Sequence, residues 1–266
     1  MSILDSFSLR GKVALVTGGA RTLGYDMADA LADAGADVVI TSRDLSHAEA
    51  AAERLQAERG VDVLPLALDV RKHDDVAAVA VRARAWKGRI DVLINNAGGG
   101  IPGRPTDILQ RAPEDIEALI GTNLTGALFC CQEVGRIMVE QRCGKIINIA
   151  SIAGLVGRDR GMYHRTGLAQ QPVDYAAAKA GVIGLTLDMA AYLAPFGVYV
   201  NCISPGGFER GQPEAFVQAY SERTALGRMG RDGSDIKAAA LFLASAASDY
   251  VTGHNLVLDG GFVLWH

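Results

Sequence analysis

Seven short apolar runs alternate with longer helical patterns along this chain, and no other feature constrains its fold as strongly. Each run is almost continuously apolar, as strands buried on both faces of a parallel sheet are. The expected strands are residues 12–17, 36–41, 62–67, 90–95, 145–150, 198–203 and 255–259. The expected helices between them are residues 23–34, 45–58, 74–86, 113–141 and 174–194. The pattern predicts an α/β fold over residues 1–266: a single doubly wound Rossmann-type domain with a mostly parallel, seven-stranded sheet and helices on both faces.

The size and charge of the chain disfavour several classes of protein. Its 266 residues suffice for one sizeable core and fit one domain better than two. A net charge of -4 disfavours a nucleic-acid surface, and the four cysteines form no CxxC pair, which favours free thiols. The longest near-apolar run, Ile146 to Gly157, is too short to span a bilayer, and we see no signal peptide. We expect a cytoplasmic protein with a small-molecule substrate and no nucleic-acid or membrane partner.

The segment TGGARTLG, residues 17–24, follows the first expected strand and opens the first expected helix. Gly18 can adopt backbone angles closed to other residues, and Gly24 has no side chain to keep the helix away from the sheet. The N–H groups at a helix N-terminus suit a pyrophosphate, and Arg21 adds a fixed positive charge. The segment predicts a dinucleotide-binding turn, and a tight turn without a ligand is the alternative.

The end of the second expected strand indicates which dinucleotide binds. Enzymes that prefer NAD often carry an acid here for the ribose 2′-hydroxyl. This chain has Ser42 and Arg43, which can bind a 2′-phosphate that Arg21 could also reach. Asp44 comes late and is expected only to cap the next helix. The sequence predicts NADP(H), with NAD(H) as the alternative if Arg43 is only a solvated surface charge.

A tyrosine and a lysine lie four residues apart in the segment DYAAAK, which places Tyr175 and Lys179 on one face of an expected helix. A nearby ammonium group stabilises a phenolate and is expected to lower the tyrosine pKa from about 10. Such a tyrosine can exchange a proton with a carbonyl or alcohol oxygen. The pair alone is a weak signal, because an ordinary amphipathic helix can carry it by chance.

Together with other segments in a fixed order, these motifs resemble the short-chain dehydrogenase/reductase family. The segments are TGGARTLG, Asp69-Val70, NNAG (95–98), Asn123 in TNLTG, Ser151 after KIINIA, YAAAK, NCISPGG and YVTGHNLVLDGG (250–261). The resemblance covers about residues 8–263 and concerns the form with a TGxxxGxG turn and a YxxxK catalytic pair. It implies an NAD(P)-dependent oxidoreductase that interconverts a secondary alcohol and a ketone.

The resemblance also implies residue roles. Tyr175 would be the general acid/base, and Ser151 would hydrogen-bond the reacting oxygen. Lys179 would bind the nicotinamide ribose and lower the tyrosine pKa, while Asn123 would hold a water of the proton relay. The residues implied for cofactor binding are Gly18, Arg21, Thr22, Leu23, Gly24, Ser42, Arg43, Asp69, Val70, Asn96, Ala97, Gly98, Tyr175, Lys179, Pro205, Gly206 and Phe208. None of the five histidines has metal-ligand spacing, so no metal is expected.

Two features depart from the family pattern. Thr22 replaces the second glycine of the turn, and a β-branched residue disfavours positive φ. Ser151 and Tyr175 lie 24 residues apart, about twice the gap of many members, so residues 157–174 look like an insertion beside the site. Residues 204–233 form a second long segment, expected to be a substrate lid.

The insertion suggests the substrate. It would place Arg158, Arg160, Tyr163 and His164, with Ser151 and Tyr175, at the substrate mouth, which suits a sugar, polyol or sugar acid. A solvated flap or a subunit contact is the alternative for this segment. A 3-oxoacyl-thioester reductase and a non-catalytic cofactor-binding sensor are the alternative functions. The resemblance further implies a homo-oligomer, commonly a tetramer.

Overall fold

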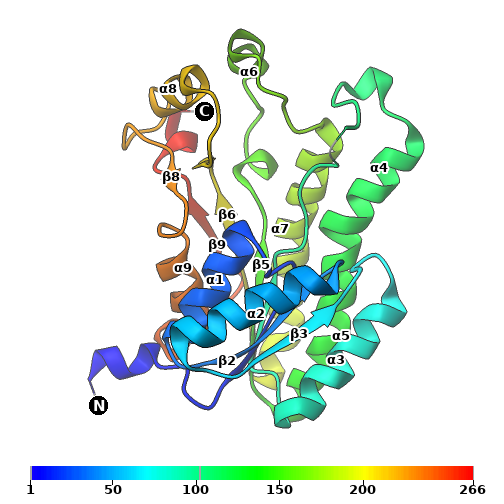
Figure 1. Ribbon diagram of the computed structural model, residues 1–266, viewed down its shortest axis with the longest axis vertical. Helices are drawn as coiled ribbons and strands as arrows, with labels where there is room; N and C mark the ends of the chain where they lie inside the picture. Colours follow the sequence, from blue (N-terminus) through cyan, green and yellow to red (C-terminus); the bar gives the residue numbers. More distant parts are fainter. Residues whose placement is uncertain (1, 102, 266) are drawn as a thin grey trace.

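The computed structural model describes residues 2–101 and 103–265. One sheet of seven parallel strands has the order β3-β2-β1-β4-β5-β6-β9, with helices on both faces (Figure 1). The strands are β1 Val13–Val16, β2 Asp37–Ser42, β3 Val63–Ala67, β4 Val92–Asn95, β5 Gly144–Ile149, β6 Val198–Pro205 and β9 Asn255–Leu258. Every strand expected from the apolar runs is present, and the expected fold class is confirmed.

Strand β1 shows why these runs are continuously apolar. Ala14 and Val16 belong to one hydrophobic core, whereas Val13 and Leu15 belong to the core on the other face of the sheet. Successive side chains of a strand point to opposite faces, so a sheet covered on both sides needs apolar residues at every position.

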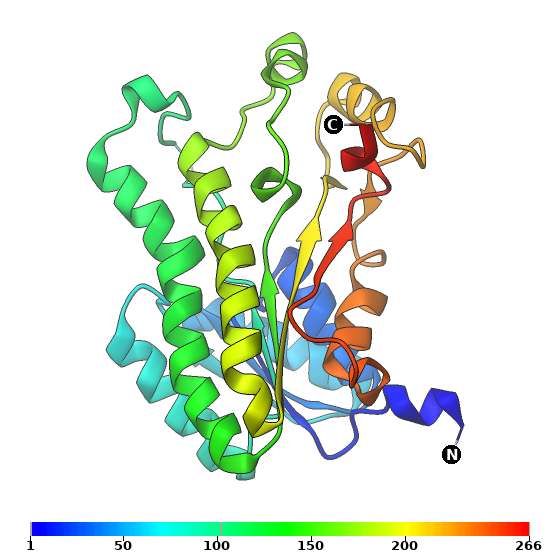
Figure 2. The ribbon, with the colours of Figure 1, turned by 180° about the vertical axis from the view of Figure 1, so that it is seen from behind.

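The helices form two layers (Figures 1 and 2). On one face lie α1 Thr22–Asp33, α2 Leu45–Arg59 and α9 Lys237–Ala244. On the other lie α3 His73–Lys87, α4 Pro113–Ile120, α5 Gly126–Gln141 and α7 Val173–Leu193. The long helix expected over residues 113–141 is thus α4 and α5, joined by a π-helical turn over Gly121–Thr125. Such turns are frequent at functional sites.

The two segments expected to be long loops contain short elements. Residues 157–174 include α6 Arg160–Thr166, and residues 204–233 include α8 Glu214–Ser221. Strands β7 Phe208–Glu209 and β8 Gly230–Arg231 pair in a second, small sheet. Helices α6 and α8 contact each other beyond the carboxyl ends of β5 and β6 (Figure 1). The segments on either side of the expected site therefore pack together.

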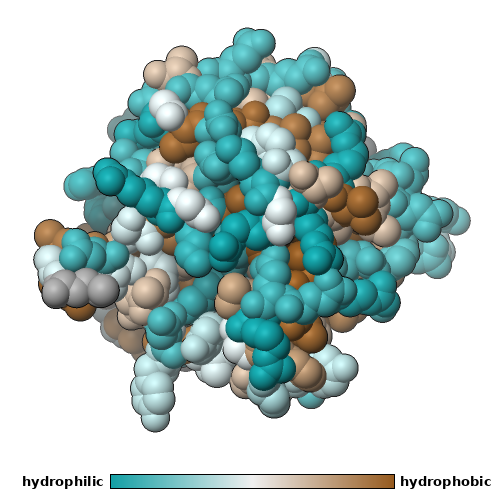
Figure 3. All heavy atoms as spheres, turned by 90° about the horizontal axis from the view of Figure 1, so that it is seen from below, coloured by the Kyte–Doolittle hydropathy of each residue, from teal (hydrophilic) through white to brown (hydrophobic). Residues whose placement is uncertain are grey.

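Helix α7 and the turn after it form the one candidate membrane-spanning segment among the described residues. By length and composition alone, Val173–Phe196 could cross a bilayer, although no continuous apolar run marks this segment. Here the helix packs against β6 and carries Asp174 and Lys179 as buried side chains, so it is part of the α/β layer. The opposite end of the molecule, at the amino ends of the strands, is mainly hydrophilic with scattered hydrophobic patches (Figure 3).

Candidate active site

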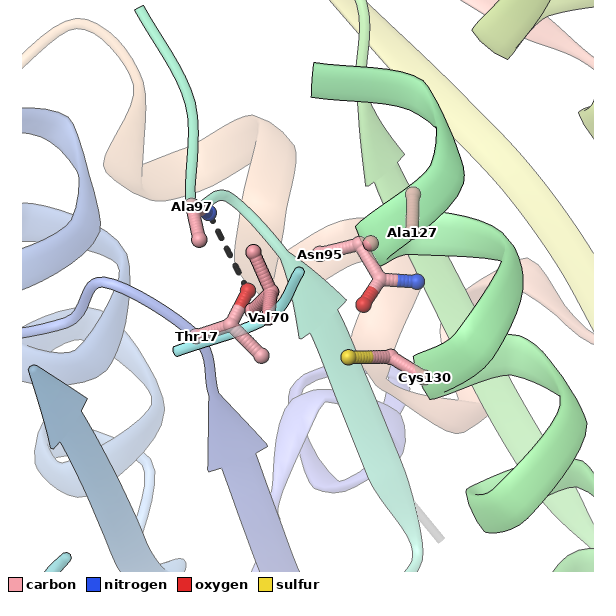
Figure 4. Close-up of a pocket in the computed structure, with 7 residues that line it drawn as sticks. Thr17, Val70, Asn95, Ala97, Ala127 and Cys130 are labelled. Carbon is pink, nitrogen blue, oxygen red and sulfur yellow. Dashed lines mark hydrogen bonds between the residues drawn. The ribbon is translucent and has the colours of Figure 1, made fainter. Parts of the chain in front are cut away.

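Thr17 joins β1 and β4, which are neighbours in the sheet although β2 and β3 lie between them in the sequence. Its Oγ1 accepts hydrogen bonds from the backbone N–H of Asn96 at 3.0 Å and of Ala97 at 3.1 Å, the latter drawn in Figure 4. A small cavity beside this junction is lined by Thr17, Val70, Asn95, Ala97, Gly126, Ala127 and Cys130 (Figure 4). Ligands bind outside such a switch point in open α/β sheets. The sequence motif contains Thr17 but gives no sign of this role.

The glycine turn is packed as closely as its atoms allow. Gly18 has φ +61°, and the Asn96 side chain donates from Nδ2 to the Gly18 carbonyl at 3.0 Å. A Cβ on Gly24 would lie 2.2 Å from that carbonyl oxygen and 2.4 Å from Asn96 Nδ2. Arg21 is the N-cap of α1 without a side-chain cap bond, so N–H groups of the first turn stay available for a pyrophosphate. This cradle fits a dinucleotide.

Thr22 and Leu23 complete the turn. Thr22 has φ +50°, so the threonine adopts the left-handed conformation of the glycine it replaces, which is strained for a β-branched residue. The residue thus adopts the positive φ that a β-branched side chain disfavours. The Leu23 side chain packs against the hydrophobic core, so its N–H rather than its side chain is suited to the cofactor.

The end of β2 adjoins the same turn. The Gly19 N–H donates to the Thr41 carbonyl at 3.1 Å. Arg21 follows Gly19 by two residues, and Arg43 follows Thr41 by two residues, so both arginines are close in sequence to this contact. Both arginines are exposed, and Ser42 is partly buried. Asp44 caps α2 as expected: its Oδ1 accepts from the Ser46 N–H at 3.0 Å. Ser42 and Arg43, rather than an acid, thus stand at the end of β2.

Asp69 and Val70 lie beyond β3. Asp69 does not cap α3; it forms an ion pair with Arg71 at 2.6 Å, and this hydrogen bond lowers the pKa of its carboxyl. The positive charge of Arg43 acts in the same direction on Asp69, which places Arg43 near this edge. Val70 is buried beside Gly126 of α5, where a Cβ would lie 2.7 Å from its side chain. Arg71 is a further charged neighbour that the sequence motifs do not assign.

Three of the four expected catalytic residues meet beyond β5. Ser151 is the first residue after Ala150, and its side chain hydrogen-bonds that of Tyr175. Lys179, one turn further along α7, donates from Nζ to the Ile149 carbonyl at 2.7 Å and lies 5.7 Å from the centroid of the Tyr175 ring. The spacing of the YxxxK pair thus places both side chains at the end of β5.

The expected direction of the tyrosine pKa is wrong for this structure. Burial raises the pKa of Tyr175, and this outweighs the Ser151 hydrogen bond and the positive charge of Arg158, which act to lower it. Burial also lowers the pKa of Lys179, to about 8. Burial disfavours the charged forms of both side chains, so desolvation has a larger effect on the Tyr175 pKa than the lysine charge expected from the sequence.

Asn123, in the π-helical turn, fixes the loop after β4. Its Oδ1 accepts from the Gly99 N–H at 2.8 Å, and its Nδ2 donates to the Gly99 and Leu119 carbonyls at 2.9 and 3.0 Å. A Cβ on Gly98 would lie 2.5 Å from Asn123 Oδ1 and 3.5 Å from Lys179 Nζ. The side chain therefore holds the loop after β4 in place, and both of its N–H groups are used in doing so.

The segment after β6 is held by α8. Pro205 ends β6, and the Gly206 N–H donates to the Leu258 carbonyl at 2.9 Å. The next N–H, that of Gly207, donates to the Tyr220 hydroxyl at 2.6 Å. Phe208 is buried, and its ring packs over Gly230. Phe208 thus supports the backbone of this segment, while Tyr220 is a positioning contact that the sequence does not reveal.

The insertion brings only part of its expected residues to the site. The charges of Arg158 and Tyr163 act on Tyr175, and the Arg158 guanidinium lies 5.6 Å from the Tyr163 ring centroid. Arg158 also donates to the Gln171 carbonyl at 2.5 Å, which fixes its side chain. Arg160 is partly buried at the start of α6, and His164 is exposed.

An apolar cluster covers the same side. Tyr163 of α6 contacts Phe216 of α8 with ring centroids 5.1 Å apart, and Tyr220 stacks on Phe262 at 4.5 Å. Met162 and Met229 complete the buried part of the cluster. An ion pair between Asp159 and Arg223, 2.8 Å long, joins the two segments again.

The chain is similar to known proteins over nearly its whole length. A family model described as Enoyl-(Acyl carrier protein) reductase matches residues 18–263. The 5-keto-D-gluconate 5-reductase of Escherichia coli is 35% identical over 266 residues, covering 98% of each chain. A 3-oxoacyl-[acyl-carrier-protein] reductase of Chlamydia muridarum is 36% identical over 257 residues, covering 95% of this chain and 98% of the relative. A gluconate 5-dehydrogenase structure from Burkholderia cenocepacia, in complex with NADP and tartrate, has a TM-score of 0.88 at 36% identity and covers 99% of both chains.

The fold and these similarities show a Rossmann-type, NAD(P)-dependent oxidoreductase acting on CH–OH groups. The chain belongs to the short-chain dehydrogenase/reductase family. The family expected from the sequence is thereby confirmed.

Proposed function

We propose that this protein interconverts a secondary alcohol and a ketone on a sugar acid or a similar polyhydroxylated anion, with NADP(H) as the favoured cofactor. The observation that carries the substrate class is Arg158, fixed by the Gln171 carbonyl and close enough to Tyr175 for its charge to affect the phenol. A guanidinium at that position can pair with a substrate carboxylate in a fork. The relatives named for gluconate and keto-gluconate support the same class.

The chain supplies binding and proton transfer. Gly18, Gly24 and the N-terminus of α1 would hold the pyrophosphate, and Gly98, Pro205 and Gly206 would line the nicotinamide. When bound, NADP(H) would supply the hydride chemistry, giving a hydride in ketone reduction and taking one in alcohol oxidation. Tyr175 would donate its hydroxyl proton to the carbonyl oxygen while Ser151 holds that oxygen by a hydrogen bond. Lys179, whose Nζ lies at the end of β5, would bind the nicotinamide ribose.

A panel of substrates tests the class. We expect turnover of NADPH with 5-keto-D-gluconate to exceed that with cyclohexanone and with a 3-oxoacyl thioester, and Tyr175→Phe to abolish turnover. Arg158→Met should raise KM for 5-keto-D-gluconate by about 10-fold or more, since a charged hydrogen bond contributes about 1.5–3 kcal/mol, and should leave KM for cyclohexanone unchanged. The matched control is Arg165→Met, because Arg165 lies in the same segment with 67% of its side chain exposed. Near-normal activity of Tyr175→Phe would contradict the mechanism.

Cofactor choice is tested separately. Ser42, Arg43 and Arg21 would bind the 2′-phosphate of NADP(H). We expect NADPH to bind more tightly than NADH, and Arg43→Ala to weaken NADPH binding by about 10-fold or more without changing NADH binding. Arg54→Ala, on the exposed side of α2, is the control. Equal affinities of the wild type for the two cofactors would refute this assignment.

A second candidate is a 3-oxoacyl-thioester reductase. The apolar cluster of Met162, Phe216 and Tyr220 beside the site favours an acyl chain more than a sugar, and the relative from Chlamydia carries that name. Faster turnover of a 3-oxoacyl thioester than of 5-keto-D-gluconate would select it. A non-catalytic sensor would bind NADPH and turn over no ketone of the panel.

We further propose a single-domain, cytoplasmic homotetramer. Leu128 of α5 and Leu187 and Tyr192 of α7 are exposed apolar side chains on helices that could pair with a second copy, and Leu264 and Trp265 are exposed near the C-terminus. Light scattering that gives the mass of a monomer would reject the tetramer.

A further inference from the structure

A buried ion pair adjoins the catalytic helix and takes no part in the chemistry proposed above. Arg111 and Asp174 are joined from Nη2 to Oδ2 at 2.8 Å, with side chains 1% and 4% exposed. Asp174 is the second residue of α7 and directly precedes Tyr175. Arg111 lies 63 residues earlier, just before α4.

The same arginine holds two backbone carbonyls. Its Nη1 donates to Pro105 at 2.6 Å, and its Nη2 also donates to Asp115 at 3.0 Å. One guanidinium therefore connects the loop after β4, the first turn of α4 and the first turn of α7. The guanidinium holds its donors in a fixed plane, so this one side chain can serve acceptors on three different segments.

The pair is poorly arranged for stability. Arg111 Nε and Asp174 Oδ1 are buried and have no hydrogen-bond partner among the described residues. Desolvating two charges is costly, and replacing such a pair by apolar residues is often neutral or stabilising. Because each side chain keeps one buried polar atom without a hydrogen bond, stability alone does not explain why this ion pair is buried here.

That reason lies in what the pair joins. The loop after β4 includes Gly99, which Asn123 holds, and Gly100, where a Cβ would lie 2.4 Å from Gln171 Oε1. The Gln171 carbonyl in turn accepts the hydrogen bond from Arg158. The cofactor-lining loop, the substrate segment and the start of α7 are thus connected around Tyr175.

We propose that Arg111 and Asp174 are positioning residues that fix the start of α7 against the loop after β4, so that the Tyr175 hydroxyl stays on Ser151. Neither residue touches the substrate. The proposal rests on the proposed catalytic role of Tyr175. Movement of the tyrosine by about 1 Å would suffice to slow proton transfer by about 100-fold.

The test compares Arg111→Met/Asp174→Leu with the wild type, using 5-keto-D-gluconate or, if it turns over faster, the best ketone of the panel. We expect kcat to fall by about 10- to 100-fold, with KM and the Kd for NADPH within about 3-fold and Tm within a few degrees of wild type. The limb of the kcat–pH profile that belongs to Tyr175 should move to higher pH, because a displaced tyrosine loses the Ser151 hydrogen bond that lowers its pKa. Arg111→Lys should also lower kcat, because an ammonium group lacks the fixed donor directions of the guanidinium.

If the apolar double variant does not fold, Arg111→Gln/Asp174→Asn takes its place in the same test. Its side chains are neutral but can still form hydrogen bonds. Asp91→Asn is the matched control: Asp91 is also buried and paired, but at the start of β4, away from the site, so Tm should fall with kcat unchanged. A kcat and pH profile within 2-fold of wild type for a folded double variant would overturn the proposal. Turnover retained by Tyr175→Phe would instead show that the proposed mechanism itself is wrong.

Discussion

Replacing Thr22 by glycine should stabilise the protein. Thr22 has φ +50°, and a left-handed conformation costs a non-glycine residue about 1–3 kcal/mol. The side chain is exposed, and its hydroxyl has no hydrogen bond with the described residues, so its removal loses little. Glycine adds about 0.4–1 kcal/mol of unfolded-state entropy, which opposes the gain. The expected net effect is about 1 kcal/mol of added stability.

Thermal unfolding and urea titration of the cofactor-free protein measure this effect. For a chain of this size, about 1 kcal/mol corresponds to a Tm increase of about 2–4 °C. Thr22→Ala is the matched control: it removes the same hydroxyl and methyl but keeps the Cβ that clashes at positive φ, so it should gain less than half as much. NADPH should bind Thr22→Gly at least as tightly as the wild type. A lower Tm for Thr22→Gly, or an equal gain for Thr22→Ala, would refute strain as the cause.

Two further predictions concern the same end of the sheet. Gly24→Ala should weaken NADPH binding by about 10-fold or more and lower Tm, because the added Cβ would lie 2.2 Å from the Gly18 carbonyl oxygen; cofactor titration by fluorescence would check it, and unchanged binding would contradict the close packing. Burial lowers the folded-state pKa of Lys179 to about 8, below the unfolded value of about 10.5. Between these pH values the unfolded chain binds one proton more than the folded chain. The free energy of unfolding should therefore rise with pH in this window, by about 3 kcal/mol in total. The difference in unfolding free energy between wild type and Lys179→Met, measured from pH 7 to 10, should show this slope, and parallel curves would exclude it.

Much of the fold follows from local patterns. The apolar runs predict all seven strands of the main sheet because a strand buried on both faces, such as Val13–Val16, must be apolar at every position. Asp44 caps α2 as its position before Leu45 predicts. The π-helical turn at Asn123 is different: it depends on the clamp between Asn123 and Gly99, a contact across 24 residues that no helical period encodes.

The candidate site divides in the same way. The spacing of Tyr175 and Lys179 places both on one helix face, and the motif order carries the family. Which residues of the insertion reach Tyr175 depends on the packing of α6 against α8, so Arg158 and Tyr163 lie near the phenol while His164 faces solvent. Tyr220 has no motif at all and is recognised only by its hydrogen bond to Gly207.

The layered parallel sheet, the glycine turn at its switch point and the family follow from the residue order, because they depend on residue types repeated at short, regular intervals. The direction of the Tyr175 pKa, the left-handed backbone of Thr22 and the pairing of Arg111 with Asp174 become visible only in the folded chain. These properties arise from desolvation and from contacts between distant segments, and both depend on how the finished layers pack.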